Sequence, residues 1–241
     1  MNRFAILPLC LALLASQPMS RAQTVLPAGA DEPVPAPSSA APVEAGFLLP
    51  GDYAQSTTVT DLEARFGKAN VRVAEQRTDW GEMQRGLVLF PDDPTRRAYV
   101  TFHNPDALSD VARITVRDAG SRWRGKHGVH VGMSFAELRQ ANGKPFYFGG
   151  FEGGLRGWAH DSWSPALDGD DGQLGRLDVD EGEHMYFEVE LGLRDAAKAL
   201  PAGAWPVDEP SLSSDDPRFP RLGELAEVTA ISASTSLDDE W

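Results

Sequence analysis

A helix-sized phrase occurs twice in this chain, as STTVTDLEARFGKAN at residues 56–70 and as GMSFAELRQANGKPF at residues 132–146. In the second copy, Ser134 followed by Glu137 spells a capping box, in which each side chain bonds the backbone N–H of the other residue. Gly143 follows the apolar stripe and suits the left-handed conformation that ends many helices. The pattern therefore predicts a short helix between Ser134 and Gly143.

The first copy carries the same signals. Thr58 and Asp61 spell its capping box, and Gly67 marks its end. The apolar residues expected to face a core are Val59, Leu62 and Phe66 in the first copy and Phe135 and Leu138 in the second. Helices this short are unstable alone in water, so each is expected to pack on a sheet.

Strand-like segments follow each copy, separated by turn-forming stretches such as PDDPT and NPDALSD. In the first half the predicted strands are 71–76, 86–90, 97–103 and 111–117. In the second half they are 146–158, 173–179, 184–191 and 227–232, with a short helix at 195–200. The pattern predicts an α+β fold built from two repeats of a short helix packed on a four-stranded antiparallel meander.

The two halves also align residue by residue. Tyr99 in RAYVTF corresponds to Tyr186 in HMYFEV. Near the end of each half, Val111-x-x-Ile114 corresponds to a second Val-x-x-Ile that ends at Ile231. We therefore expect the last strand of one repeat to be the counterpart of the last strand of the other.

Two further segments precede the repeats. Residues 1–22 combine a basic start, an apolar stretch and a final Ser-Arg-Ala, which is typical of a cleaved signal peptide. Residues 23–45 are rich in Pro, Ala and Ser and are expected to form a disordered tether. The repeats then occupy 46–126 and 127–241. Because Cys10 lies in the predicted signal, the exported chain is expected to use no disulfide.

Charge narrows the class of partner. Loss of Arg3 and Arg21 with the signal leaves 20 basic and 36 acidic residues, a net charge of −16. Nucleic acids and anionic lipids require a basic surface, so neither is expected as a general partner. No stretch after the predicted signal has the length and apolar character of a transmembrane helix. These observations predict a periplasmic or secreted protein.

The stretch GMSFAELRQANGKP, from Gly132 to Pro145, resembles the G-M-[ST]…G-x-P helix signature of the BamE (SmpA/OmlA) outer-membrane lipoproteins. Two such units in tandem resemble the β-lactamase inhibitor protein family. Only the second copy spells the full signature. The resemblance implies small helices on one face of an antiparallel sheet, with the other face free to bind protein. It implies neither a cofactor nor a particular target.

Aromatic residues gather around the glycine-rich stretch FGGFEGGLRGW at 148–158. This stretch lacks the Gly-Lys-Ser/Thr ending of a phosphate-binding loop, and we interpret it as a strand pair with a tight turn. Exposed aromatic side chains anchor many protein interfaces. We therefore expect a sheet face with about two exposed aromatic anchors. The candidates are Phe146, Phe148, Trp158 and Trp163.

A basic connector joins the repeats. From Arg113 to Lys126 it holds five cations and one acid. It is either a solvated connector or a surface for an anionic partner, and in the second case Arg122 and Arg124 are its binding residues.

The histidines fit a zinc site and a catalytic triad only in part. His127 and His130 have a zinc-like spacing, with His160 and His184 as further ligands, but the pair contains glycine and no cysteine supports it. His160-Asp161 supplies two members of a catalytic triad, yet the chain has no G-x-S-x-G elbow. We therefore predict neither a metal nor a catalytic residue.

An acidic segment lies at 168–183. Gly172 falls where the third ligand of a calcium loop would stand, so a solvated hairpin is favoured and weak calcium binding stays open.

The sequence thus predicts an exported, non-catalytic envelope protein that binds another protein through an exposed sheet face. Two alternatives remain: a binder of small ligands or cell-wall glycan that uses Trp158, Trp163 and Trp205, and a hydrolase. A hydrolase would show a cleft with a perturbed acid or base, whereas a binding module would show a broad face without one.

Overall fold

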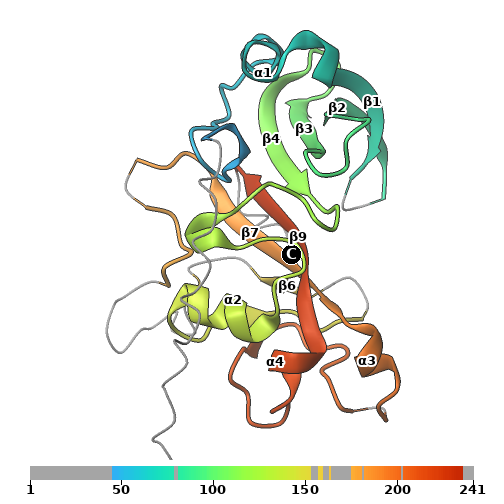
Figure 1. Cartoon of the computed structure of the whole chain (residues 1–241), viewed down its shortest axis with the longest axis vertical. Helices are drawn as coiled ribbons and strands as arrows, with labels where there is room; N and C mark the ends of the chain where they lie inside the picture. The colour runs from blue at the N-terminus through green and yellow to red at the C-terminus, as the bar shows by residue number, and fades with distance from the viewer. Residues whose placement is uncertain are drawn as a thin grey trace, which may run out of the picture. The chain divides into compact units, whose positions relative to one another are not determined.

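The computed structural model describes residues 45–78, 81–152, 157–159, 163, 175–180, 182–201 and 203–235 (Figure 1). The predicted signal at 1–22 lies outside these residues, as does the predicted tether at 23–45 apart from Ala45. The described residues all belong to one unit of the chain, Ala41–Trp241.

Both predicted helices form where their capping boxes place them. Helix α1 covers Val59–Phe66 and helix α2 covers Phe135–Asn142. The Thr58 hydroxyl accepts from the Asp61 N–H, and the Asp61 carboxylate accepts from the Thr58 N–H. Ser134 and Glu137 make the same reciprocal pair at α2. Gly143 ends α2 in the left-handed region, with φ of 81°. The helix prediction is confirmed in both copies.

The strands form one large antiparallel sheet, which makes the fold α+β. Its strands are β1 Val71–Arg77, β2 Met83–Leu89, β3 Ala98–Asn104, β4 Ser109–Val116, β6 Trp158–Ala159, β7 Tyr186–Leu193 and β9 Ala226–Ser234. Their order across the sheet is β1-β2-β3-β4-β9-β7-β6. The first four strands therefore follow the chain as a meander, and β4 joins β9 from the second half (Figure 1).

Short elements complete the fold. They are a two-stranded sheet of β5 Tyr147–Phe148 and β8 Leu212–Ser213, helices α3 Asp195–Lys198 and α4 Leu222–Leu225, and single turns η1 Ala45–Phe47, η2 Lys68–Asn70 and η3 Lys126–Gly128. Helix α3 lies within the short helix predicted at 195–200.

Two predicted strands of the second half are corrected. The range 146–158 does not form one strand, because Gly149–Glu152 lie outside any strand between β5 and β6. The described part of 173–179 contains no strand. The physical reason is a partner distant in sequence. Gly150 donates to the Glu209 carbonyl, and a Cβ on Gly150 would lie 2.5 Å from the Val207 carbonyl oxygen. Gly149 also donates to the Trp158 carbonyl, and Gly157 donates to the Gly150 carbonyl, so this stretch bonds both to residues 206–209 and to the start of β6.

One hydrophobic core lies against one face of the sheet. The two main helices contribute Leu62, Phe135 and Leu138 to it, and the strands contribute alternate residues. Aromatic side chains within this core form two groups, one of Phe47, Tyr53, Phe66, Phe90 and Trp123 and one of Phe135, Phe146, Phe148, Trp163 and Phe187. Each main helix therefore packs with an aromatic group of its own half.

Candidate binding groove on the polar face of the sheet

The face of the sheet that points away from the core is polar. Strand register places its side chains in two rows. One row is Tyr99, Thr115, Ser232 and Glu188, and the other is Thr101, Arg113, Ser234 and Tyr186. Neighbours across antiparallel strands lie about 4.5–5.5 Å apart on one face, so these hydroxyls and charges adjoin one another along each row. Four of the eight side chains are buried: Thr115, Glu188, Ser232 and Ser234. We call these eight residues the polar face.

One side of the polar face is bordered by the end of the β1–β2 hairpin. The Gln76 side chain crosses over Gly86 and donates to the carbonyl oxygens of Leu87 and Val100. Glycine is required at 86, because a Cβ there would lie 2.8 Å from Gln76 Nε2 and 2.5 Å from the Val100 oxygen. Strands β2 and β3 pair over Leu87–Leu89. The Gln76 amide binds the Leu87 and Val100 carbonyls at the point where β2 and β3 separate.

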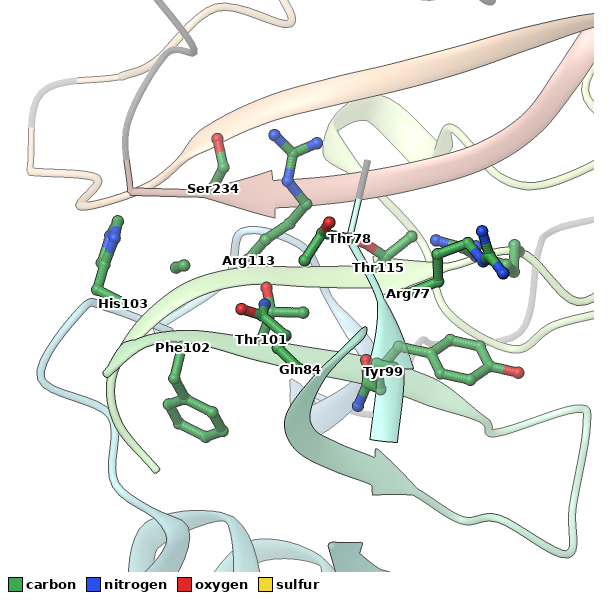
Figure 2. Close-up of a pocket in the computed structure, with 13 residues that line it drawn as sticks. Arg77, Thr78, Gln84, Tyr99, Thr101, Phe102, His103, Arg113, Thr115 and Ser234 are labelled. Atoms are coloured by element: carbon green, nitrogen blue, oxygen red, sulfur yellow. The ribbon is translucent and has the colours of Figure 1, made fainter. Parts of the chain in front are cut away.

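Between this hairpin end and the polar face lies a groove of about 320 Å³ (Figure 2). The ionisable nitrogen groups that line it belong to Arg77, His103, Arg113 and Arg117. Its hydroxyl groups belong to Thr78, Tyr99, Thr101, Thr115 and Ser234. The described lining residues include no aspartate or glutamate, in a chain whose formal net charge is −14. The groove is therefore a cationic exception on an acidic protein.

Arg113 is held in place by a nearly buried carboxylate. Its Nη1 lies 2.8 Å from Glu188 Oε2, and the two side chains are 13% and 3% exposed. Ser234 Oγ donates to the other oxygen of Glu188 at 2.7 Å, and the Arg113 guanidinium lies 4.8 Å from the Trp158 ring centre. Figure 2 shows Arg113 extending toward the strand that carries Ser234. The positive charge of Arg113 is thus largely balanced within the protein.

Arg77 and Arg117 are the exposed cations of the groove. The Arg117 guanidinium lies 5.4 Å from the Tyr99 ring centre, and Arg77 Nη1 donates to the Gly81 carbonyl at 3.3 Å. Neither arginine makes an ion pair, in the part of the chain that the structure describes. Both guanidinium groups therefore keep donors available for a ligand.

His103 marks the other end of the groove. Its Nε2 lies 2.9 Å from Thr235 Oγ1, which also donates to the Val111 carbonyl. The groove as a whole offers hydrogen-bond donors and positive charge, which suit the recognition of an anion.

Three of the four predicted interface aromatics belong to the core. Phe146, Phe148 and Trp163 are 0%, 2% and 1% exposed. The Phe146 ring lies 5.2 Å from that of Trp163, whose Nε1 donates to the Phe187 carbonyl. The expectation that these side chains form an exposed face is therefore wrong. The alternative of glycan binding also loses Trp163, because a buried ring cannot stack on a sugar. Trp158 is half-buried and reaches the polar face through Arg113.

The basic connector does not form one surface. Arg122 is exposed, with its guanidinium 5.5 Å from the Phe47 ring centre, whereas Arg124 Nη1 donates to the carbonyls of Ser121 and Trp123. Only the Arg113 and Arg117 end of the connector reaches the groove. A binding role for Arg122 and Arg124 stays a prediction.

Lys126 ends the connector inside an acidic cluster. Its side chain is 7% exposed and makes ion pairs with Asp180 and Glu183 at 2.8 and 2.9 Å. The bond from the Lys126 ammonium lowers the pKa of Asp180, whereas burial raises the pKa of Asp178. The described part of the acidic segment is thus tied to η3.

The described histidines do not gather into a metal site. His127 lies in η3 with φ of 50°, and His130 Nδ1 lies 2.9 Å from the Gly128 carbonyl oxygen. Within the described ranges, no three or more His, Cys, Asp or Glu residues are grouped to hold a metal ion. His160, Asp161 and residues 168–174 lie outside those ranges. No described helix has the length and apolar character needed to cross a membrane.

The groove residues were missed at the sequence level although a signal for them exists. In AYVTFH, from Ala98 to His103, apolar and polar residues alternate, which places Tyr99, Thr101 and His103 on one face of a strand. The hairpin end that completes the groove depends on the Gln76 contact across Gly86, and no local pattern predicts that contact.

Comparison of the chain with protein-family models, with curated proteins and with solved structures finds no match in any of the three.

Proposed function

We propose that this chain is an exported envelope protein that binds another protein through the polar face of its sheet. The observation that carries the proposal is the groove, in which Arg77 and Arg117 stand exposed beside a floor of hydroxyl groups. Arginine and tyrosine are enriched at protein interfaces, because each combines apolar area with hydrogen-bond donors. A surface of this kind stays hydrated when free and still supplies specific bonds to a partner.

The shape of the site also favours a protein partner. The groove draws its lining from β1, β2, β3, β4 and β9. A partner can therefore contact several strands at once, as a macromolecule does. The export part of the proposal rests on the signal-like residues 1–22 and the tether-like residues 23–45.

We further propose that the chain consists of two like units that meet at β4 and β9. The alignment that pairs Ile114 with Ile231 makes Thr115 the counterpart of Ser232, and these two residues face each other in the sheet. A two-fold relation between two units requires such a meeting of counterparts. The separate helix and aromatic group of each half also support the resemblance to tandem BamE-like units.

The register suggests one change to the alignment. Thr115 pairs with Tyr99, and Ser232 pairs with Glu188. Under the two-fold relation the counterpart of Tyr99 is therefore Glu188, and Tyr186 lies one row away on the same face.

Site-specific photo-crosslinking tests the binding role. A crosslinking amino acid at Thr101, half-buried on the polar face, is expected to capture a discrete partner from an envelope fraction of the source organism. The matched control carries the same amino acid at Glu224, an exposed position on α4 outside the polar face. Equal capture at both positions, or none at Thr101 in a folded protein, would reject the proposal.

A further inference from the structure

We propose that the groove recognises an acidic segment of the partner protein, whose carboxylates bind Arg77 and Arg117. This inference rests on the proposed function, because it names the chemistry of the partner at the same face. Its starting point is the charge of the lining, which combines three arginines with no described acid in a chain of net charge −14.

The two exposed arginines have the donors that a carboxylate requires. Arginine presents a planar fork of N–H groups that matches the two oxygens of a carboxylate, and such charge-assisted bonds are among the strongest hydrogen bonds in proteins. Arg117 lies against the Tyr99 ring, which limits the motion of its guanidinium. Arg113 differs, since Glu188 already bonds it. Arg77 and Arg117 are therefore the groups expected to set the affinity.

Hydroxyl groups that line the same groove supply further donors. A carboxylate has about four acceptor positions, more than one arginine fork fills. Thr101 and Tyr99 are half-buried at the groove floor, and their hydroxyls have freedom to turn toward a ligand. A ligand carboxylate can thus bind a guanidinium and a hydroxyl together.

The setting of the groove favours a segment of protein over a small free anion. The lining comes from five strands. An extended peptide carries acidic side chains on one face at every second position, as strands do. It therefore offers several carboxylates along the floor, whereas a small dicarboxylate reaches only part of it.

Peptide binding to the full chain tests this directly. The probe is a fluorescein-labelled peptide of alternating Ser and Glu, and its control has Gln in place of each Glu. We expect the Glu peptide to bind at least about 10-fold more tightly than the Gln peptide, because each charge-assisted bond is worth about that factor. Arg77→Gln and Arg117→Gln are each expected to weaken the Glu peptide about 10-fold.

Arg85→Gln is the matched control. Arg85 is also an exposed arginine of the β1–β2 hairpin, but it does not line the groove and donates instead to the Asp106 carbonyl. This variant should bind the Glu peptide as the parent chain does. Thermal melts of all three variants show whether folding is intact. Equal binding of the Glu and Gln peptides, or equal weakening by Arg85→Gln, would overturn the proposal.

Competition separates the sources of the anion. Succinate and inorganic phosphate, at the concentration that suffices for the unlabelled Glu peptide, should not displace the labelled probe. Displacement by either at that concentration would show that the groove takes a small free anion, and the peptide proposal would then fail.

The crosslinking experiment distinguishes this inference from the proposed function. If Thr101 still captures its partner in the Arg77→Gln and Arg117→Gln double variant, the face binds a protein without using these carboxylate contacts, and only this inference fails. If the Glu peptide binds but Thr101 captures nothing, the anion groove stands and the protein-binding function fails.

Discussion

Ser232 Oγ donates to Thr115 Oγ1 at 3.1 Å across strands β4 and β9, and both residues are nearly buried. Each hydroxyl is therefore the main partner of the other where the two halves of the chain meet. Removing one hydroxyl leaves a buried polar group without its partner, which costs more than removing both.

A double-mutant cycle tests this pair. Thr115→Val and Ser232→Ala should each lower the free energy of unfolding by about 1 kcal/mol. The double variant should lose less than the sum of the two single losses, because no unsatisfied hydroxyl remains. Urea unfolding measures all four proteins. Strict additivity would mean that the hydrogen bond contributes nothing to stability.

The buried aromatics give a second prediction. Phe146→Ala removes a fully buried ring from the group around Phe135 and Trp163 and should cost about 3–5 kcal/mol of unfolding free energy. Trp158→Ala removes a half-buried ring at the polar face and should cost clearly less. Equilibrium unfolding in urea decides the order, and a reversed order would contradict the assignment of Phe146 to the core.

These aromatics also show what the sequence can and cannot predict. The two helices were predictable because a capping box, an apolar stripe and a terminal glycine are all local signals. The strands of the first half were predictable from alternation and turns. Burial of Phe146 and Trp163 was not, because it depends on contacts with Phe135 and Phe187, and the strand at 146–158 failed because Gly150 binds a segment near Glu209.

The candidate site was harder to predict than the fold. Alternation in β3 was enough to place Tyr99 and Thr101 on one face, but aromatic composition drew attention to residues that pack inside. Arg113 and Arg117 fell within a basic run that was noted as a whole, and its members separate in space: Lys126 is tied to Asp180, whereas Arg117 reaches the groove.

The helix cap of α2 gives a third prediction. Ser134→Ala removes the acceptor of the Glu137 N–H and the donor to the Glu137 carboxylate, so it should cost about 1 kcal/mol. The Ser134 hydroxyl lowers the pKa of Glu137, so its stabilisation is present above the unfolded pKa and is lost as the pH falls through the folded value. The difference between the urea midpoints of parent and variant should therefore narrow in acid, and a pH-independent difference would exclude this linkage.

Tyr53 gives a prediction at alkaline pH. Its hydroxyl donates to the Gly46 carbonyl at 2.7 Å, and burial raises its pKa from 10.0 to about 12. The neutral form is favoured in the folded state, so its stabilisation is complete below pH 10 and is lost as the pH rises through 12, by about 2–3 kcal/mol in all. Tyr53→Phe should flatten this part of the stability curve, measured by urea unfolding between these pH values. An unchanged slope would mean that other groups cause the alkaline loss.

Glu188 gives the prediction that joins stability to binding. Its carboxylate lies beneath the groove, bonded to Arg113 and Ser234, and it neutralises the Arg113 charge. Glu188→Gln keeps an acceptor for Ser234 but removes the negative charge. The variant should therefore unfold more easily, because Arg113 loses its ion partner in a shielded position. It should nevertheless bind the Glu peptide several-fold more tightly, since loss of the Glu188 charge makes the region of the groove more positive close to the ligand. Fluorescence anisotropy measures the affinity.

The control for the altered net charge is Glu75→Gln, which changes an exposed acid on β1 that does not line the groove. Weaker binding by Glu188→Gln in a folded protein would show that Glu188 acts by orienting Arg113 as a direct ligand. Equal gains in affinity in both variants would mean that net charge alone sets the affinity.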